Sequence, residues 1–467
     1  MPNSQLFRIF AIRNREVAAS RHKKETVSFI LHSIFCNFAK YSLQKTSDNP
    51  DTMATAPSTG IVFADTKPHY AILDGLRGVA ALLVILYHVF ECFDWSPAPH
   101  GYLAVDFFFV LSGFVIGYAY DDRWKKPTPS LPSVANEGFA PLDGVAATPV
   151  AALKTPVARG EGILNTFSFF RRRLIRLHPM VVAGAVIGVV CFLLQGSVKW
   201  DGTSVPFHLV MWALLFGMFM IPLWPGAAAD VRGNGEMFPL NGPNWSLFFE
   251  YIGNILYALL LHRLPTRWLA ALASVLACLL AAVALHDGYL GVGWSMVDHG
   301  FWTGLVRMLF PYTIGMLMAR EFRPMKVRNA FWLCSVVIVA VGVLPLLLGE
   351  LSPVANGLYD AVCVIFVFPL LVWVGASEMS VKATTQRVSN FLGNLSYPLY
   401  AIHYPLMYLF YAHIGFQGEL VPIAKLADVW PVALALPFAC IALGWLCFRY
   451  YDLPLRRWLS KKTTKQS

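Results

Sequence analysis

The chain contains few charged residues for its length. Only 14% of its 467 residues are Asp, Glu, Lys or Arg, whereas soluble domains contain about 25%. This scarcity excludes an ordinary soluble protein. The net charge of +10 does not indicate nucleic-acid binding, because the basic residues cluster between apolar runs, as the orientation of a membrane protein requires.

Cysteine motifs and internal repeats are also lacking. The eight cysteines lie mostly inside apolar runs, and no C-x-x-C pair occurs. We therefore expect neither a disulfide framework nor a metal site. The lack of an evident repeat argues against the many transporters that are built from repeated halves.

Long apolar runs dominate the sequence instead, since 57% of the residues are hydrophobic. Many runs reach or approach the roughly 20 residues that cross a bilayer. They lie at about 72–91, 103–120, 177–195, 207–224, 245–262, 268–285, 301–319, 330–349, 357–375, 391–413 and 427–449. The pattern predicts an all-α polytopic membrane protein.

The basic stretches predict the topology. They occur at 123–176, 263–267, 320–328, 382–387 and 456–465. Positively charged loops remain in the cytoplasm. All five share one side only if 196–243 stays outside and the run at 207–224 does not cross the membrane. We therefore expect about ten transmembrane helices, with both termini cytoplasmic.

The same pattern predicts the domain organisation. Residues 1–69 form an N-terminal extension, expected to be disordered, of which 1–52 are dispensable. Residues 70–457 form a single integral-membrane domain. Within it, 125–165 are rich in Pro, Ala, Gly and Ser, which predicts a flexible cytoplasmic insertion. Residues 458–467 are a basic cytoplasmic tail.

Arg77 and His88 are the most informative pair, because both lie in one apolar run, ILDGLRGVAALLVILYHVF. Ionisable side chains are costly in lipid and mark functional sites. Eleven residues make about three helical turns, so both side chains project from nearly the same face, about 16 Å apart. The alternative is that Arg77 reaches the interface and His88 is a packed histidine.

Further polar residues interrupt the apolar sequence. Asp106 is the only acid of its run, where it is either functional or interfacial, and Ser112-Gly113 is expected to be a helix-packing step. Glu250 enters an apolar helix and needs a cationic partner.

Two more groups occur, one between these acids and one after them. Arg173 and Arg176 lie three apart on a helical face and suit phosphate binding, although positive-inside anchoring also explains them. Tyr400 and His403 likewise share a face, and His403 alone is more typical of a packed histidine. These residues also lie in apolar or helical runs.

Four blocks, LDGLRGVAALLVILYH, VDFFFVLSGFVI, RRLIRLHP and NWSLFFE, occur in the order found in a known family, followed by LGNLSYPLYAIHYP and YDLPLRRW. Through them the chain resembles the acyltransferase-3 family of bacterial integral-membrane O-acyltransferases. The resemblance covers roughly 70–457. Ala104, Phe107, His178 and Asp452 depart from the residues common in the family. No appended hydrolase-like domain is expected.

The resemblance implies a multi-pass enzyme of the bacterial cytoplasmic membrane. It would move an acyl group, most often acetyl, from acyl-CoA to a hydroxyl of a carbohydrate or related acceptor, without a metal. His88 would be the general base or a transient acyl carrier. Arg77, Arg173 and Arg176 would hold the coenzyme phosphates, or Arg77 would orient its helix. Asp106 and Glu250 would pair with these cations. The alternative is a transporter or flippase of a glycan or lipid-linked precursor.

Overall fold

The computed structural model describes residues 70–124, 165–349, 351–378, 381–415 and 424–464. Over these ranges the chain is helical and contains no β-strand, only two isolated bridges. This confirms the all-α prediction. The expected extension 1–69 and nearly all of the insertion 125–165 lie outside the described residues, so their predicted character stays a prediction.

Helices form where the apolar runs occur. In chain order they are α3 (Ala71–Phe90), η1 (Gly101–Leu103), α4 (Ala104–Tyr120), η2 (Asp121–Trp124), α5 (Thr166–Gln195), α6 (Phe207–Met218), α7 (Asn244–Leu259), η3 (Leu261–Arg263), α8 (Thr266–Asp287), α9 (Gly300–Glu321), α10 (Ala330–Leu348), α11 (Pro353–Val362), η4 (Cys363–Val367), α12 (Phe368–Ser377), α13 (Ala383–Ile402), α14 (Tyr404–His413), α15 (Leu426–Cys447), η5 (Phe448–Asp452) and α16 (Leu453–Thr464).

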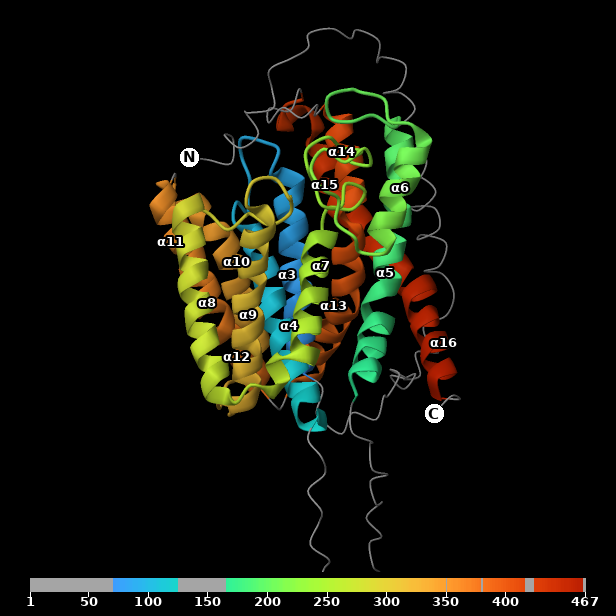
Figure 1. Ribbon diagram of the computed structural model, residues 1–467. Coiled ribbons are helices and arrows are strands. Elements are labelled where there is room, and N and C mark those ends of the chain that lie inside the picture. Colours follow the sequence, from blue (N-terminus) through green and yellow to red (C-terminus); the bar gives the residue numbers. More distant parts are fainter. Residues whose placement is uncertain (1–69, 125–164, 350, 379–380, 416–423, 465–467) are drawn as a thin grey trace, which may run out of the picture.

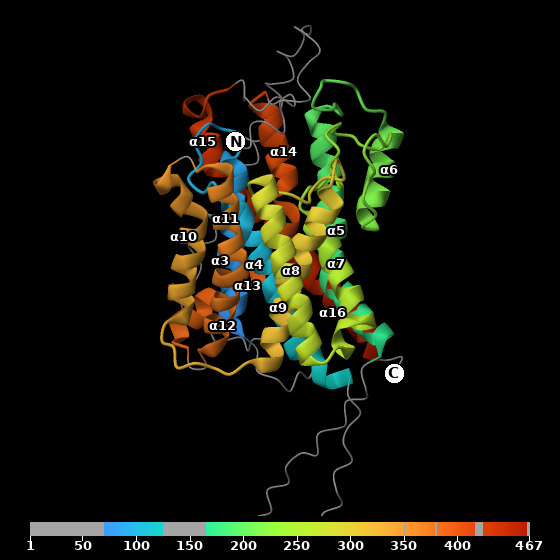
Figure 2. The same ribbon diagram turned by 60° about the vertical axis from the view of Figure 1, so that its left-hand side comes forward.

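The helices form one bundle whose members run roughly along a common axis (Figures 1 and 2). In it, α3, α4, α7 and α13 are central, α8 to α12 lie on one side, and α5, α6 and α16 lie on the other. The most extensive contacts join α3 to α13 and α4 to α9. The candidate residues of α3, α4, α7 and α13 therefore lie on central helices, whereas Arg173 and Arg176 lie on α5 at the side of the bundle.

Small residues allow α4 and α9 to approach closely. A Cβ atom at Gly113 would lie 2.0 Å from the Tyr312 carbonyl oxygen, and one at Gly315 would lie 2.2 Å from the Val110 carbonyl oxygen. No larger residue fits either position without separating the helices. The expected packing step at Ser112-Gly113 is confirmed.

Seven helices are long and apolar enough to cross a membrane: Ala71–Phe90, Gly101–Trp124, Thr166–Gln195, Thr266–Asp287, Ala330–Leu348, Pro353–Ser377 and Leu426–Lys461. Helix α7 has only 16 residues, and α9 and α13 are long enough but more polar. Helix α6 has 12 residues, fewer than a span needs. The protein is thus a multi-pass membrane protein, and the count of ten spans stays a prediction.

The predicted basic stretches meet at one end of the bundle, the lower end in Figure 1. The end of α4, the start of α5, the α7–α8, α9–α10 and α12–α13 connections, and α16 all lie there. Contacts join several of them, because Arg320 Nε donates to Asp121 and Nη1 donates to the Leu264 carbonyl, each at 2.6 Å. The common end agrees with the expected topology, while the compartment it faces stays a prediction.

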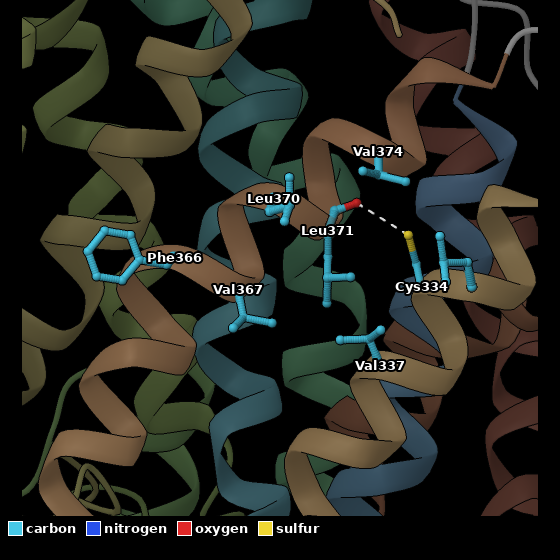
Figure 3. A pocket seen from close by; sticks show the side chains of 8 residues that line it. Cys334, Val337, Phe366, Val367, Leu370, Leu371 and Val374 are labelled. Carbon is cyan, nitrogen blue, oxygen red and sulfur yellow. Dashed lines mark hydrogen bonds between the residues drawn. The ribbon is translucent and has the colours of Figure 1, made fainter. Parts of the chain in front are cut away.

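An apolar pocket lies between α10 and the η4–α12 segment (Figure 3). Its only hydrogen bond among the side chains drawn runs from Cys334 Sγ to the Leu371 carbonyl, at 3.7 Å. Leu333, Phe366 and Leu370 line it and are more than half exposed. The pocket opens on the outer surface of the bundle and offers no polar group for chemistry, so the candidate site lies elsewhere.

Candidate active site

Arg77 and His88 both face α13, which confirms that they share one face of α3. The Arg77 Nε–H donates to Ser396 Oγ at 3.2 Å. The ring of His88 lies 5.5 Å, centroid to centroid, from that of His403 at the end of α13. The two residues occupy different depths, because Arg77 lies in the second turn of α3 and His88 in the last.

His88 is held by a carboxylate that the sequence analysis did not identify. Its Nδ1 lies 2.8 Å from Glu91 Oε1, and Tyr411 also donates to Glu91, at 2.7 Å. The ring of Tyr404 packs edge-on against the imidazole, with centroids 4.8 Å apart. In the neutral ring, an Nδ1–H that donates to the carboxylate leaves a lone pair on Nε2 of His88. In the sequence, this pair was indicated only by the acid three residues after the histidine, at the end of the apolar run.

His403 is completely buried beside His88. Its Nδ1 lies 2.8 Å from the Tyr400 carbonyl oxygen. A carbonyl only accepts, so Nδ1 carries the hydrogen and Nε2 carries the lone pair. Within the described part of the chain, Nε2 has no hydrogen-bond partner. His403 is thus packed as expected, but only Nδ1 of its two ring nitrogens is hydrogen-bonded among the described residues.

Polar residues continue along the same face of α13. Ser396, Tyr400 and His403 are four and three residues apart, which places them one above the other on a helix. The Tyr400 and Ser246 hydroxyls are 2.6 Å apart and share a hydrogen bond. This face of α13 therefore extends through the interior of the bundle from Arg77, which contacts Ser396, to His88, which lies beside His403.

Glu250 has the cationic partner that the sequence predicted. Arg173 Nη2 donates to Glu250 Oε1 at 2.7 Å, and Ser112 donates to the same oxygen at 2.8 Å. The Arg173 side chain is buried, and its Nε has no partner among the described residues. The carboxylate therefore fixes one of the arginines expected to bind the donor.

Arg176 differs from Arg173 because it is exposed. Its charge interacts with those of Arg77 and Arg173, so the three guanidinium groups form one cluster. Arg77 also donates to Asp74, one turn earlier, at 2.6 Å. Three cations with two carboxylates leave the cluster positive, which favours an anionic ligand.

Asp106 does not pair with Arg77, Arg173 or Arg176, and that expectation was wrong. It forms a bidentate pair with Arg307 of α9, with Arg307 Nη2 and Asp106 Oδ2 2.8 Å apart. Arg307 also donates to the Tyr102 and Val292 carbonyls. The close α4–α9 packing brings the two charges together, and no sequence spacing reports a pairing over 201 residues.

Another buried arginine that was not anticipated, Arg232, lies in the segment between α6 and α7, and it contacts Tyr408, whose ring packs on Tyr404. The guanidinium carbon of Arg232 lies 3.8 Å from the centroid of the Tyr408 ring, and Trp200 and Phe192 flank it at 4.7 and 4.8 Å. Tyr408 donates to Glu236. Burial raises the pKa of Glu236 to about 7, although the bonds from Tyr408 and Asn234 lower it. In the sequence, the charged residues of the stretch DVRGNGE (230–236) were the one indication of these buried groups.

These features define a multi-pass helical membrane protein with buried, paired charges and an imidazole–carboxylate pair inside the bundle. The chain belongs to the acyltransferase-3 family, because the model of that family's acyltransferase domain matches residues 70–451. It is therefore a transferase, and the transporter alternative loses its support. No solved structure matches the chain.

Several named proteins are similar to this chain, and some of their names state an acyltransferase activity. "Protein 2 in picA locus" of Rhizobium radiobacter is 28% identical over 40% of this chain and 81% of the relative. Staphylococcus aureus proteins named "Putative O-acetyltransferase" are 24% identical over 82% of this chain, which spans only 57% of their length. "Acyltransferase MdmB" of Streptomyces mycarofaciens is 24% identical over 84% of this chain and 92% of the relative.

Proposed function

We propose that the protein moves an acyl group, acetyl in the simplest case, from acyl-CoA to a hydroxyl of a carbohydrate or related acceptor, such as O-antigen or exopolysaccharide. The observation that carries this proposal is the 2.8 Å contact between His88 and Glu91. A carboxylate that orients an imidazole is the usual partner of a general base in acyl transfer.

The guanidinium cluster supports an anionic donor. Arg77, Arg173 and Arg176 would contact the coenzyme phosphates, which guanidinium forks bind well. Arg77 precedes His88 by about 16 Å along α3. With its phosphates at the depth of the arginines, the coenzyme would extend along the polar face of α13. Its thioester would then lie at the depth of the histidines.

In the proposed reaction, His88 Nε2 removes the proton of the acceptor hydroxyl. The hydroxyl oxygen bonds to the thioester carbon, and the carbonyl π pair moves to the carbonyl oxygen. Collapse reforms the carbonyl and breaks the C–S bond, and the coenzyme thiolate takes the proton from the imidazolium. General-base catalysis contributes about 10² to 10⁴-fold. A transient acyl-histidine is the other role open to His88.

The proposed location is the bacterial cytoplasmic membrane, with the basic end of the bundle in the cytoplasm where acyl-CoA is made. Acceptor groups on the other side would then approach the end that carries His88. The extension 1–52 takes no part in this proposal, and a chain that starts at Met53 is proposed to keep its activity.

The test supplies acetyl-labelled acetyl-CoA to membrane vesicles from cells that express the full chain. We expect alkali-labile, labelled acetyl esters in the carbohydrate fraction, and none in vesicles from cells without the chain. Movement of unmodified glycan across the membrane without label in esters would contradict the proposal and favour transport.

A further inference from the structure

A buried amide donor without a partner lies at the start of α7, next to the candidate active site. Asn244 is 1% exposed, and its Nδ2 has no hydrogen-bond partner among the described residues. Buried polar groups are almost always paired, and an unpaired donor is costly to keep. A ligand group that accepts a hydrogen bond would remove this cost.

The orientation of the amide is fixed by a relay of two asparagines. Asn241 Nδ2 donates to the Ala401 carbonyl at 2.7 Å and to Asn244 Oδ1 at 3.1 Å. The carbonyl of Ala401 only accepts, so the nitrogen of Asn241 must face it. Asn244 then presents its oxygen to Asn241 and its NH₂ group away from it.

Gly184 of α5 leaves the space that this relay needs. A Cβ atom there would lie 2.5 Å from Asn241 Nδ2 and 2.6 Å from the Ala401 carbonyl oxygen. The relay is therefore packed against α5 as well as α13, which fixes the free donor before any ligand binds.

The residues around Asn244 lie against Tyr400 and Tyr404, the two tyrosines whose rings lie near His403. Ser246 shares a hydrogen bond with Tyr400. A Cβ atom at Gly242 would lie 3.0 Å from the ring of Tyr404, whose ring in turn packs on His88. The turn that carries Asn244 thus covers the stretch from Tyr400 to Tyr404, where the two imidazoles meet.

We infer that the Asn244 amide donates a hydrogen bond to the carbonyl oxygen of the acyl group as that oxygen becomes negative during transfer. This inference rests on the proposed function. A donor that is held in place before the reaction stabilises the developing charge without rearrangement. The position at the first residue of α7 adds the positive end of the helix dipole.

The inference predicts a loss of rate without a loss of donor binding. Asn244→Leu removes the donor, and Asn244→Asp replaces it with an oxygen while keeping the atom that Asn241 binds. We expect each to lower acetyl-ester formation from acetyl-CoA by about 10²-fold or more. The half-saturating acetyl-CoA concentration should stay near that of the wild type.

Asn254 provides the matched control. It lies ten residues later on α7, about 15 Å away, is equally buried, and also has an amide nitrogen without a partner among the described residues. Asn254→Leu should keep ester formation within about twofold of wild type. A loss in Asn254→Leu equal to that in Asn244→Leu would overturn the inference.

Wild-type rates in both Asn244 variants would also overturn it, as would a loss caused only by weaker acetyl-CoA binding. If Asn244→Leu does not accumulate in the membrane, Asn244→Asp decides, and a wild-type rate there overturns the inference. Ester formation that requires His88 but not Asn244 leaves the proposed function intact. No esters from the wild-type chain would overturn the proposed function itself.

Discussion

Glu91 Oε1 lies 2.8 Å from Nδ1 of His88, one helical turn earlier on α3, and also accepts a hydrogen bond from Tyr411. The carboxylate fixes the imidazole through one nitrogen and leaves the other for chemistry.

Glu91→Gln should lower acetyl-ester formation roughly 10²-fold, since it weakens the orientation and charge stabilisation of a general base. Glu91→Asp should recover part of the rate, because it keeps the charge. The half-saturating acetyl-CoA concentration should not change in either variant. Equal rates for Gln, Asp and wild type would mean that Glu91 only ends the helix.

His88→Ala and His88→Gln should both abolish acylation while membrane insertion stays near normal. Glutamine keeps hydrogen bonding but accepts no proton near neutral pH. His403→Gln should be milder, because the Gln carbonyl still offers an acceptor in place of Nε2. Mass spectrometry of the acceptor and immunoblotting of the protein measure the two effects. Near-normal acylation by His88→Gln would exclude both the base and the acyl-carrier roles.

Arg176→Ala should raise the half-saturating acyl-CoA concentration about tenfold or more, because a hydrogen bond to a charged group contributes about 1.5–3 kcal/mol. Arg176→Lys should rescue poorly, since an ammonium lacks the guanidinium fork. The exposed Arg387→Ala serves as a control from another basic stretch. An unchanged half-saturating acyl-CoA concentration in Arg176→Ala would mean that Arg176 serves only to orient the chain in the membrane.

Arg173→Ala should affect both binding and folding, and this distinguishes it from Arg176→Ala. Its removal leaves Glu250 with one neutral donor, Ser112. We expect weaker use of acyl-CoA together with a lower melting temperature of the purified protein. An unchanged melting temperature would show that the Arg173–Glu250 pair adds no net stability.

Asp106→Asn should destabilise the fold, because it leaves Arg307, which is 1% exposed, without its counter-charge. Breaking a buried pair costs about 3–5 kcal/mol. A double change to Leu at both positions should regain part of the loss. Thermal unfolding in detergent measures it. An Asp106→Asn protein of normal stability but no activity would return Asp106 to a catalytic role.

Reporter fusions should place residues near 140, 325 and 460 in the cytoplasm, and those near 97 and 235 outside. The physical reason is that positive loops are retained on the cytoplasmic side. A cytoplasmic signal at 235 would contradict the ten-span topology, because 196–243 must stay outside for the five basic stretches to agree.

The sequence alone determined the helices, the membrane class and part of the site. Apolar runs must form helices in a bilayer, because backbone groups there can bond only within the segment. Helical periodicity placed Arg77 with His88 and Tyr400 with His403. The cost of a lone buried carboxylate predicted a cation for Glu250.

Tertiary structure decided which charges meet. Asp106 pairs with Arg307 rather than with Arg77, and Arg232 packs against aromatic rings. Both contacts form because close helix packing and chain reversals bring distant segments together. The orientation of the Asn244 amide depends on Asn241, whose Nδ2 donates to both Asn244 Oδ1 and the Ala401 carbonyl. Periodicity along one helix describes its own faces, but it does not report which neighbour covers each face or at what depth.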